Sequence, residues 1–132
     1  MKVLSLKEPW ASLIKEEIKS IETRSWSTKY RGELYIQSSK RILTKKNLIE
    51  YKEQLNLLKD INFKYGYIIL KCKLVDCIYM DEEYIKNIKN NHNEYISGSY
   101  SVGRYAWILK DIKVLKEPIE AKGQLGIWTY KD

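Results

Sequence analysis

Three charged residues within six positions, Lys19, Glu22 and Arg24, are the part of this 132-residue sequence best suited to chemistry. A lysine offers a base or nucleophile, a glutamate a second acid or an acceptor, and an arginine a bidentate clamp for an anion. The alternation from Ser20 onward predicts a strand on which Glu22, Arg24 and Trp26 share one face, and the first two lie about 6.6 Å apart along the chain. That spacing lets both side chains contact one ligand.

The three charged residues are expected to point into one cleft and to act as a functional unit. The alternative is a solvated strand face, on which charged residues at alternate positions are ordinary. An exposed ion pair contributes about 0–1 kcal/mol to stability. Lys19→Ala and Glu22→Ala are therefore expected to leave folding nearly unchanged if these residues serve a ligand.

Hydrophobic spacing predicts the elements that position these residues. An amphipathic helix over residues 9–17 leads into Lys19, and two further helices follow the N-capping residues Thr44 and Asp81. Residues 90–103 indicate an exposed polar loop, a kind of segment that often carries a site. Strands are predicted at residues 3–6, 20–26, 32–38, 104–115 and 123–128, with one or two more over residues 65–80.

Short strands with inserted helices and no βαβ alternation indicate an α+β fold rather than a parallel sheet. The length suits one domain over residues 1–132, large enough to bury a core. On the strand at residues 32–38, Leu34, Ile36 and Ser38 share one face and Gln37 lies on the other. The expected core contains Leu4, Leu6, Leu13, Leu34, Ile36 and Ile69.

Composition bounds the partners and the location. The net charge of +7 and the pI near 9.3 suit a polyanionic partner. However, only four of the 24 basic residues are arginine, and a basic set made mostly of lysine also fits the codon usage of an AT-rich genome. No apolar run approaches the roughly 20 residues of a membrane span, and a signal-peptide pattern is lacking, so we expect a cytoplasmic protein with no membrane partner. Cys72 and Cys77 fall on opposite strand faces and only His92 accompanies them, so neither a metal nor a cofactor is expected, only buried or half-buried thiols.

The order and spacing of several short motifs resemble those of ASCH domains, small proteins of the PUA-like superfamily. Residues 17–24 are similar to the GxKxxExR signature of that family, with Lys19, Glu22 and Arg24 at its charged positions. The resemblance implies a closed or nearly closed PUA-like β-barrel of about five to six strands flanked by short helices. Further similar motifs lie at residues 4–6, 31–36, 105–107 and 123–128.

Glu17 stands where the signature has its glycine, at the end of the first predicted helix. Glycine at such a position supplies a left-handed residue at low cost. Either the helix ends differently here, or Glu17 adopts a strained conformation that costs about 1 kcal/mol.

Aromatic rings and a polar strand end supply the expected ligand-binding residues. An indole such as that of Trp10 or Trp26 stacks on a base for about 1–3 kcal/mol, whereas Trp107 and Trp128 suit the core better. At the end of the predicted strand, the hydroxyls of Ser38 and Ser39 and the cations of Lys40 and Arg41 can hold a phosphate. The expected ligand-binding set is Ser5, Trp10, Trp26, Ser38, Ser39, Lys40 and Arg41.

The resemblance implies a function connected with RNA or modified nucleobases. One amidohydrolase branch of these proteins removes acyl groups from N4-acylated cytidine, with a threonine three residues after the lysine as nucleophile. That position is Glu22 here, and the neighbouring Thr23 is expected to point to the opposite strand face, so Lys19 alone matches.

Three functions remain open at this point. The first is binding of RNA or a modified nucleoside or nucleotide in a cleft at the barrel mouth lined by Lys19, Glu22, Arg24 and Trp26. The second is a small hydrolase, an amidohydrolase or ribonuclease, with Lys19, Glu22 and Arg24 as catalytic residues and the first two as acid and base. The third is a protein-binding adaptor.

Overall fold

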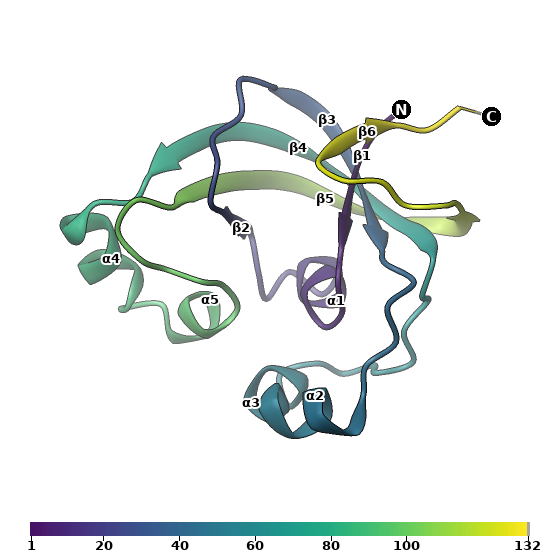
Figure 1. The fold of residues 1–132 in the computed structure, drawn as a ribbon, viewed down its shortest axis with the longest axis horizontal. Coiled ribbons are helices and arrows are strands. Elements are labelled where there is room, and N and C mark those ends of the chain that lie inside the picture. Colours follow the sequence, from purple (N-terminus) through teal and green to yellow (C-terminus); the bar gives the residue numbers. More distant parts are fainter. Residues whose placement is uncertain (132) are drawn as a thin grey trace.

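The chain forms a six-stranded sheet that curls into a half-barrel, with short helices below its concave face and at one end (Figure 1). The structure is a computed structural model and describes residues 1–131. The strand order is β2-β5-β4-β3-β1-β6, and β1 with β3 is the parallel pair in an otherwise antiparallel sheet. The predicted α+β class is confirmed.

The element bounds follow the chain. The strands are β1 Lys2–Leu6, β2 Ile21–Arg24, β3 Gly32–Ser38, β4 Tyr67–Tyr79, β5 Tyr105–Glu120 and β6 Ile127–Thr129. The helices in the described residues are α1 Trp10–Lys15, α2 Lys45–Glu50, α3 Lys52–Leu55, α4 Glu82–Ile88 and α5 His92–Ile96.

Two predicted helix starts are confirmed by their caps. The Thr44 hydroxyl accepts from the Asn47 N–H and the Asn47 side chain accepts from the Thr44 N–H, which makes a capping box. The Asp81 carboxylate accepts from the Tyr84 N–H at the start of α4. Each cap satisfies backbone donors that a helix N-terminus leaves free.

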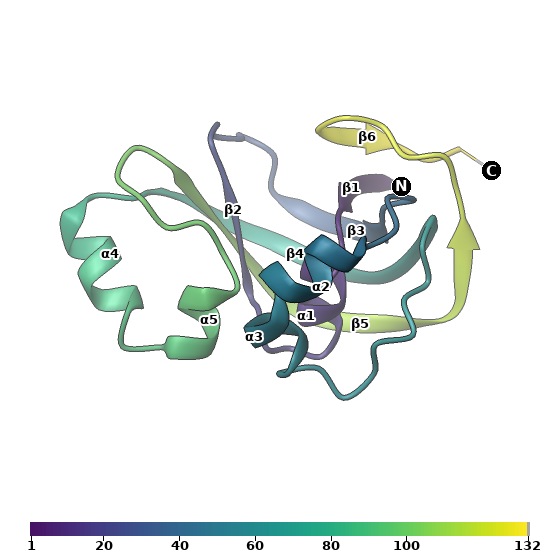
Figure 2. The same cartoon turned by 60° about the horizontal axis from the view of Figure 1, so that its bottom comes forward.

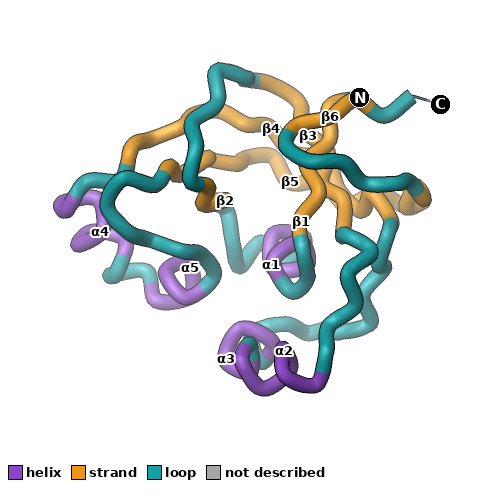
Figure 3. Tube along the Cα trace, in the orientation of Figure 1, coloured by secondary structure: helices purple, strands orange, loops and turns teal. Residues whose placement is uncertain are grey.

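Several segments differ from their predictions, and the strand predicted at residues 123–128 is the shorter β6. The second predicted helix is two short helices, α2 and α3, and β5 runs through Pro118 to Glu120 instead of ending near residue 115. Residues 90–103, predicted as a loop, contain α5, whose N-cap Asn91 accepts from the Glu94 N–H. Figure 3 shows this short helix between two loops, close to β2.

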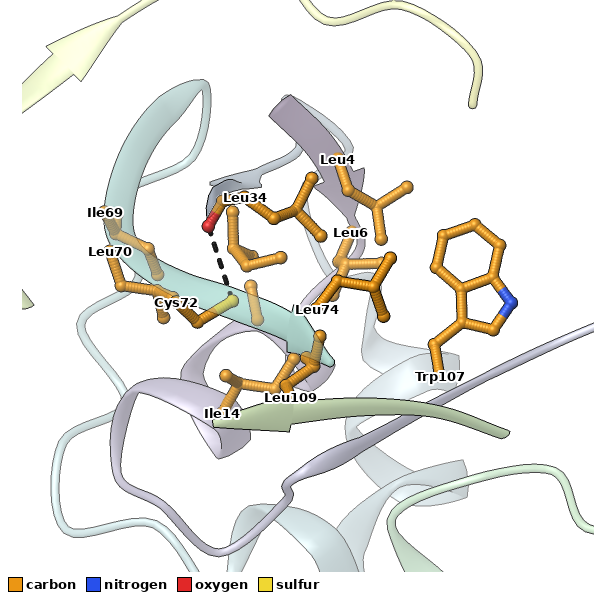
Figure 4. Close-up of a cluster of buried hydrophobic side chains, with 12 residues drawn as sticks. Leu4, Leu6, Ile14, Leu34, Ile69, Leu70, Cys72, Leu74, Trp107 and Leu109 are labelled. Atoms are coloured by element: carbon orange, nitrogen blue, oxygen red, sulfur yellow. Dashed lines mark hydrogen bonds between the residues drawn. The ribbon is translucent and has the colours of Figure 1, made fainter. Parts of the chain in front are cut away.

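The main core lies between α1 and the concave face of the sheet. Leu34 of β3 is fully buried there, together with Ile14 of α1 and Trp107 of β5, as Figure 4 shows for part of this cluster. All six predicted core residues are at most 4% exposed, because the apolar positions of β1, β3 and β4 face α1. The sequence-based core is therefore confirmed.

Cys72 belongs to this core and Cys77 is half-buried, and neither forms a disulfide. The Cys72 thiol donates to the Leu34 carbonyl at 3.3 Å (Figure 4), and burial raises the pKa of this thiol to about 12. A thiol held in its neutral form is a poor nucleophile, so its role is packing.

Among the described residues, no helix has the length and hydropathy of a membrane span.

Candidate functional site

Lys19 follows α1 and is buried, with 1% of the residue exposed. Its Nζ donates to the carbonyl oxygens of Ile21 and Ser97, both at 2.6 Å, and lies 3.4 Å from Oε1 of Glu22. An ammonium has three protons to donate, so two carbonyls and one carboxylate use them all. Lys19 therefore fastens the first residue of β2 to the end of α5.

Glu22 lies between two cations. Its Oε2 accepts from Nη1 of Arg24 at 3.1 Å while its Oε1 faces Lys19, and the residue is 7% exposed. The Arg24 guanidinium lies 4.6 Å from the ring centroid of Trp26 and 5.7 Å from that of Trp107. The residues predicted to share a strand face, Glu22, Arg24 and Trp26, thus contact one another in succession.

The burial of Lys19 and Glu22 corrects the expectation about folding. That expectation assumed an exposed pair, whereas both residues lie in the interior. Truncating one partner of a buried pair leaves the other charge without compensation and costs about 3–5 kcal/mol. Lys19→Ala and Glu22→Ala are therefore expected to destabilise the fold.

A pocket of about 260 Å³, here called the Trp10 pocket, opens beside this ion pair. Trp10 of α1 supplies an aromatic wall, and its ring meets the Tyr51 ring edge-on at 5.3 Å between centroids. The lining residues are Trp10, Lys19, Glu22, Thr23, Ser97, Gly98, Ser99 and Arg104.

The segment after α5 closes one side of the Trp10 pocket. The Thr23 hydroxyl oxygen accepts from the Ser99 N–H at 2.9 Å, and Nε of Arg104 donates to the Ser99 carbonyl at 3.0 Å. A Cβ at Gly98 would lie 2.8 Å from the Tyr100 ring and 3.0 Å from Cγ2 of Thr23, so only glycine allows this close approach. Thr23, expected on the far strand face, nevertheless lines the pocket.

Glu94 of α5 is a buried carboxylate that the sequence analysis missed. Its Oε1 accepts from the Ser20 N–H at 2.8 Å and from the Ser20 hydroxyl at 2.7 Å, and the Ile21 N–H lies 3.4 Å from its Oε2. These bonds fix the start of β2 and hence the direction of the Glu22 side chain. The polar residues 90–103 signalled a site-bearing segment, but an acid on a five-residue helix gave no signal of its own.

The predicted site residues divide between several places. Trp10, Lys19 and Glu22 line the Trp10 pocket, whereas Arg24 and Trp26 lie next to it through the contacts described above. Ser5, Ser39, Lys40 and Arg41 instead line a separate pocket of about 370 Å³, together with residues 122–125. His92, to which no role was assigned, is exposed.

Ser38 is fully buried and lies in neither pocket. Its hydroxyl donates to Oε2 of Glu8 at 2.7 Å, and the Ser12 hydroxyl donates to the same oxygen at 2.9 Å. The Ser12 N–H donates to Oε1 of Glu8 at 3.0 Å. Burial raises the pKa of Glu8, and the serine hydrogen bonds oppose that effect only in part.

Within residues 1–131, no three His, Cys, Asp or Glu side chains gather as they would around a metal ion.

The curled mixed sheet with helices at its concave side defines a PUA-like α+β domain. The chain belongs to the ASCH domain family, whose model matches residues 4–120. ASCH domains are PUA-like domains that are linked to RNA binding at the level of the family.

Two curated relatives are similar to this chain. It is 30% identical over 131 residues to Activating signal cointegrator 1 of Homo sapiens, an alignment that covers 95% of this chain and 21% of that protein. It is 37% identical over 81 residues to Activating signal cointegrator 1 of Mus musculus, covering 57% of this chain and 14% of that protein. The chain thus spans about a fifth or less of the length of these relatives.

Proposed function

We propose that the chain, acting as a single ASCH domain, binds RNA or a modified nucleoside or nucleotide by taking one base into the Trp10 pocket. The observation that carries this proposal is the Glu22 carboxylate, held between Lys19 and Arg24 beside the pocket. Each carboxylate oxygen of Glu22 has more than one lone pair, and its contact with Lys19 or Arg24 occupies only part of that capacity. Glu22 can therefore accept an N–H from the edge of a base without losing its own partners.

The size and wall of the pocket suit one flat ring. Its volume of about 260 Å³ lies just below the roughly 300–1,000 Å³ that is typical of sites for drug-sized ligands. The edge contact with Tyr51 orients the Trp10 ring. Stacking of a base on such a ring is worth about 1–3 kcal/mol.

The contacts of Lys19 favour binding over hydrolysis. A lysine acts as a base through a lone pair, but the protons of Lys19 are directed to two carbonyls and to Glu22. The Thr23 hydroxyl is held by the Ser99 N–H, and no hydrogen bond in the described residues joins it to Lys19. The pairing of nucleophile with base that covalent hydrolysis needs is therefore not formed.

The test is a titration with a panel of nucleosides, including base-modified ones, in which chromatography also follows any product. Trp10→Ala should weaken binding about 5- to 150-fold, the equivalent of one lost stacking contact of about 1–3 kcal/mol. Tyr79→Ala is the matched control, because Tyr79 is 52% exposed and lies outside the pocket lining. It should bind within about twofold of the unmodified protein, an order-of-magnitude bound for a side chain outside the contact.

Glu22→Gln tests the polar contact separately from the aromatic one. The amide keeps the size of the side chain but removes its charge and one acceptor oxygen, so affinity should fall while the selectivity for flat rings remains. Circular dichroism must show that this variant is folded. Unchanged affinity in Trp10→Ala would contradict the proposed base pocket, and accumulation of product would favour the hydrolase.

A further inference from the structure

We propose that the second pocket, here called the basic pocket, binds phosphates of the same RNA strand whose base enters the Trp10 pocket. The ligand is then a short single-stranded RNA rather than a free nucleoside. This inference rests on the proposed function of the Trp10 pocket. The basic pocket is lined by Ser5, Ser39, Lys40 and Arg41 together with residues 122–125.

Three cations meet in the basic pocket from segments far apart in the sequence. Lys40 and Arg41 follow β3, whereas Lys122 lies between β5 and β6. The lining contains no acid, and within residues 1–131 none of the three is in an ion pair. Uncompensated cations that share a concave surface concentrate the field that attracts a polyanion.

The structure holds the two sides of the basic pocket in place. A Cβ at Gly66 would lie 3.0 Å from Cγ of Lys40, so the stem of that lysine packs on the glycine and directs its ammonium. A Cβ at Gly123 would lie 2.7 Å from Oε1 of Gln37, so the chain next to Lys122 packs directly on that side chain. The Gln37 amide is fixed in turn by the Ala121 carbonyl at 2.6 Å.

A hydrogen-bonded row of side chains supports this wall from behind. The Ser5 hydroxyl donates to Oε1 of Gln37 at 2.6 Å and accepts from Nε1 of Trp128 at 2.9 Å. Because these partners lie on β1, β3 and β6, the sheet supports the loop residues that form the wall. The backbone at Lys40 and Lys122 is therefore held against the sheet on both sides of the basic pocket.

Arg41 and Tyr51 connect the basic pocket with the Trp10 pocket. Arg41 also lines a small crevice that it shares with Lys7, Tyr51 and the buried Glu8. Tyr51 contacts the ring of Trp10, which lines the Trp10 pocket. Figure 2 shows α2 and α3, which Tyr51 joins, lying across α1 on this side of the sheet. Cations alternating with aromatic rings are the surface that single-stranded nucleic acids bind.

The combination of a basic pocket with a base-sized aromatic pocket distinguishes RNA from other polyanions. A lipid headgroup or an acidic protein segment would be served by Lys40, Arg41 and Lys122 alone, and it would have no use for a base-sized pocket at the end of the path. Single-stranded RNA provides both the phosphates and the base. The proposal therefore commits to RNA.

The test uses two charge-matched triple variants of the full chain. One is Lys40→Ala, Arg41→Ala, Lys122→Ala; the control is Lys71→Ala, Lys73→Ala, Lys113→Ala. The first two control residues alternate with the core residues Leu70, Cys72 and Leu74 on β4, so they project from the opposite face of the sheet. Binding of one nucleoside and of an eight-nucleotide single-stranded RNA is measured at several salt concentrations.

The basic-pocket variant should bind RNA at least tenfold more weakly at low salt, and its log–log salt slope should be smaller by about 2, because each phosphate contact contributes about 0.7. Its nucleoside affinity should not change. The control triple should keep the unmodified slope. Circular dichroism and thermal unfolding of both triples show that the fold is retained, which is expected because Lys40, Arg41 and Lys122 are all exposed.

Other outcomes overturn the inference in distinguishable ways. An unchanged RNA affinity and slope in the basic-pocket variant, with nucleoside binding still lost in Trp10→Ala, rejects the basic pocket and leaves the proposed function standing. RNA binding that depends on the basic pocket but not on Trp10 rejects the shared strand and the base pocket together. Failure of the unmodified protein to bind either ligand rejects both proposals.

Discussion

Lys19 and Glu22 form an ion pair in the interior of the protein, with Nζ of the lysine 3.4 Å from Oε1 of the glutamate. The same ammonium binds the carbonyls of Ile21 and Ser97, which are 76 residues apart in the chain. The carboxylate that we propose as the ligand contact is therefore positioned by the contacts that fold the pocket. At Lys19, stability and binding depend on the same atoms.

Lys19→Met tests this dual role. The substitution keeps much of the apolar stem but leaves Glu22 and two carbonyl oxygens without their partner, so unfolding free energy should fall by about 3–5 kcal/mol. Urea denaturation measures the loss. Lys71→Met is the control, because Lys71 lies 3.9 Å from Glu33 on the surface and such a pair contributes about 0–1 kcal/mol. Equal small losses in the two variants would show that the Lys19 contacts are weak.

Glu17→Gly should stabilise the protein. Glu17 has φ of 58°, in the left-handed region, which costs a residue with a Cβ about 1 kcal/mol or more. Glycine removes this strain, but its freer unfolded chain offsets part of the gain, so we expect a few tenths to about 1 kcal/mol. Glu17→Ala keeps a Cβ and should gain nothing. A loss of stability in Glu17→Gly, measured by thermal unfolding, would contradict this account.

Glu17 also shows what the sequence could and could not decide. The signature glycine indicated a left-handed residue after α1. With glutamate at that position, either the helix ends differently or Glu17 itself adopts the strained left-handed conformation. The observed φ of Glu17 shows that the second alternative holds. The core was easier to predict, because apolar alternation reports directly which strand face is buried. Leu34 and Ile36 are therefore where the pattern placed them.

The hydrophobic pattern of the sequence could not predict contacts between distant segments. The bonds from Lys19 to Ser97 and from Ser20 to Glu94 join residues 78 and 74 positions apart, so the burial of Lys19 had no local signal. Gln37 stays on the strand face opposite Leu34 and Ile36, as alternation places it, but it is fully buried there by contacts with Ser5 and with the Ala121 carbonyl. Such contacts between distant segments decide which predicted ligand-binding residues lie together.

Leu34→Ala tests whether the half-barrel has a tightly packed interior. Leu34 is fully buried among Leu4, Leu6 and Cys72 (Figure 4), so its truncation should leave a cavity and cost about 2–5 kcal/mol. Leu125→Ala is the matched control, because that leucine is 98% exposed, and it should cost less than about 0.5 kcal/mol. A loss below about 1 kcal/mol for Leu34→Ala in urea would contradict close packing at this position.

Glu8 gives the protein a pH-dependent stability of unusual sign for a carboxyl group. Burial raises its pKa above the ordinary value of 4.5, against the opposing hydrogen bonds from Ser38 and Ser12. The folded state therefore binds the proton more tightly than the unfolded state does. The contribution of Glu8 is fully present below pH 4.5 and is lost as the pH rises through the folded pKa.

Glu8→Gln removes this titration while keeping the shape of the side chain. Its advantage in unfolding free energy over the unmodified protein should grow as the pH rises through the folded pKa of Glu8 and then level off, as urea denaturation at a series of pH values will show. Ser38→Ala offers a second check. It removes a hydrogen bond that favours the carboxylate, so the loss of stability should move to higher pH. A difference between Glu8→Gln and the unmodified protein that stays constant with pH would show that Glu8 does not titrate differently on folding.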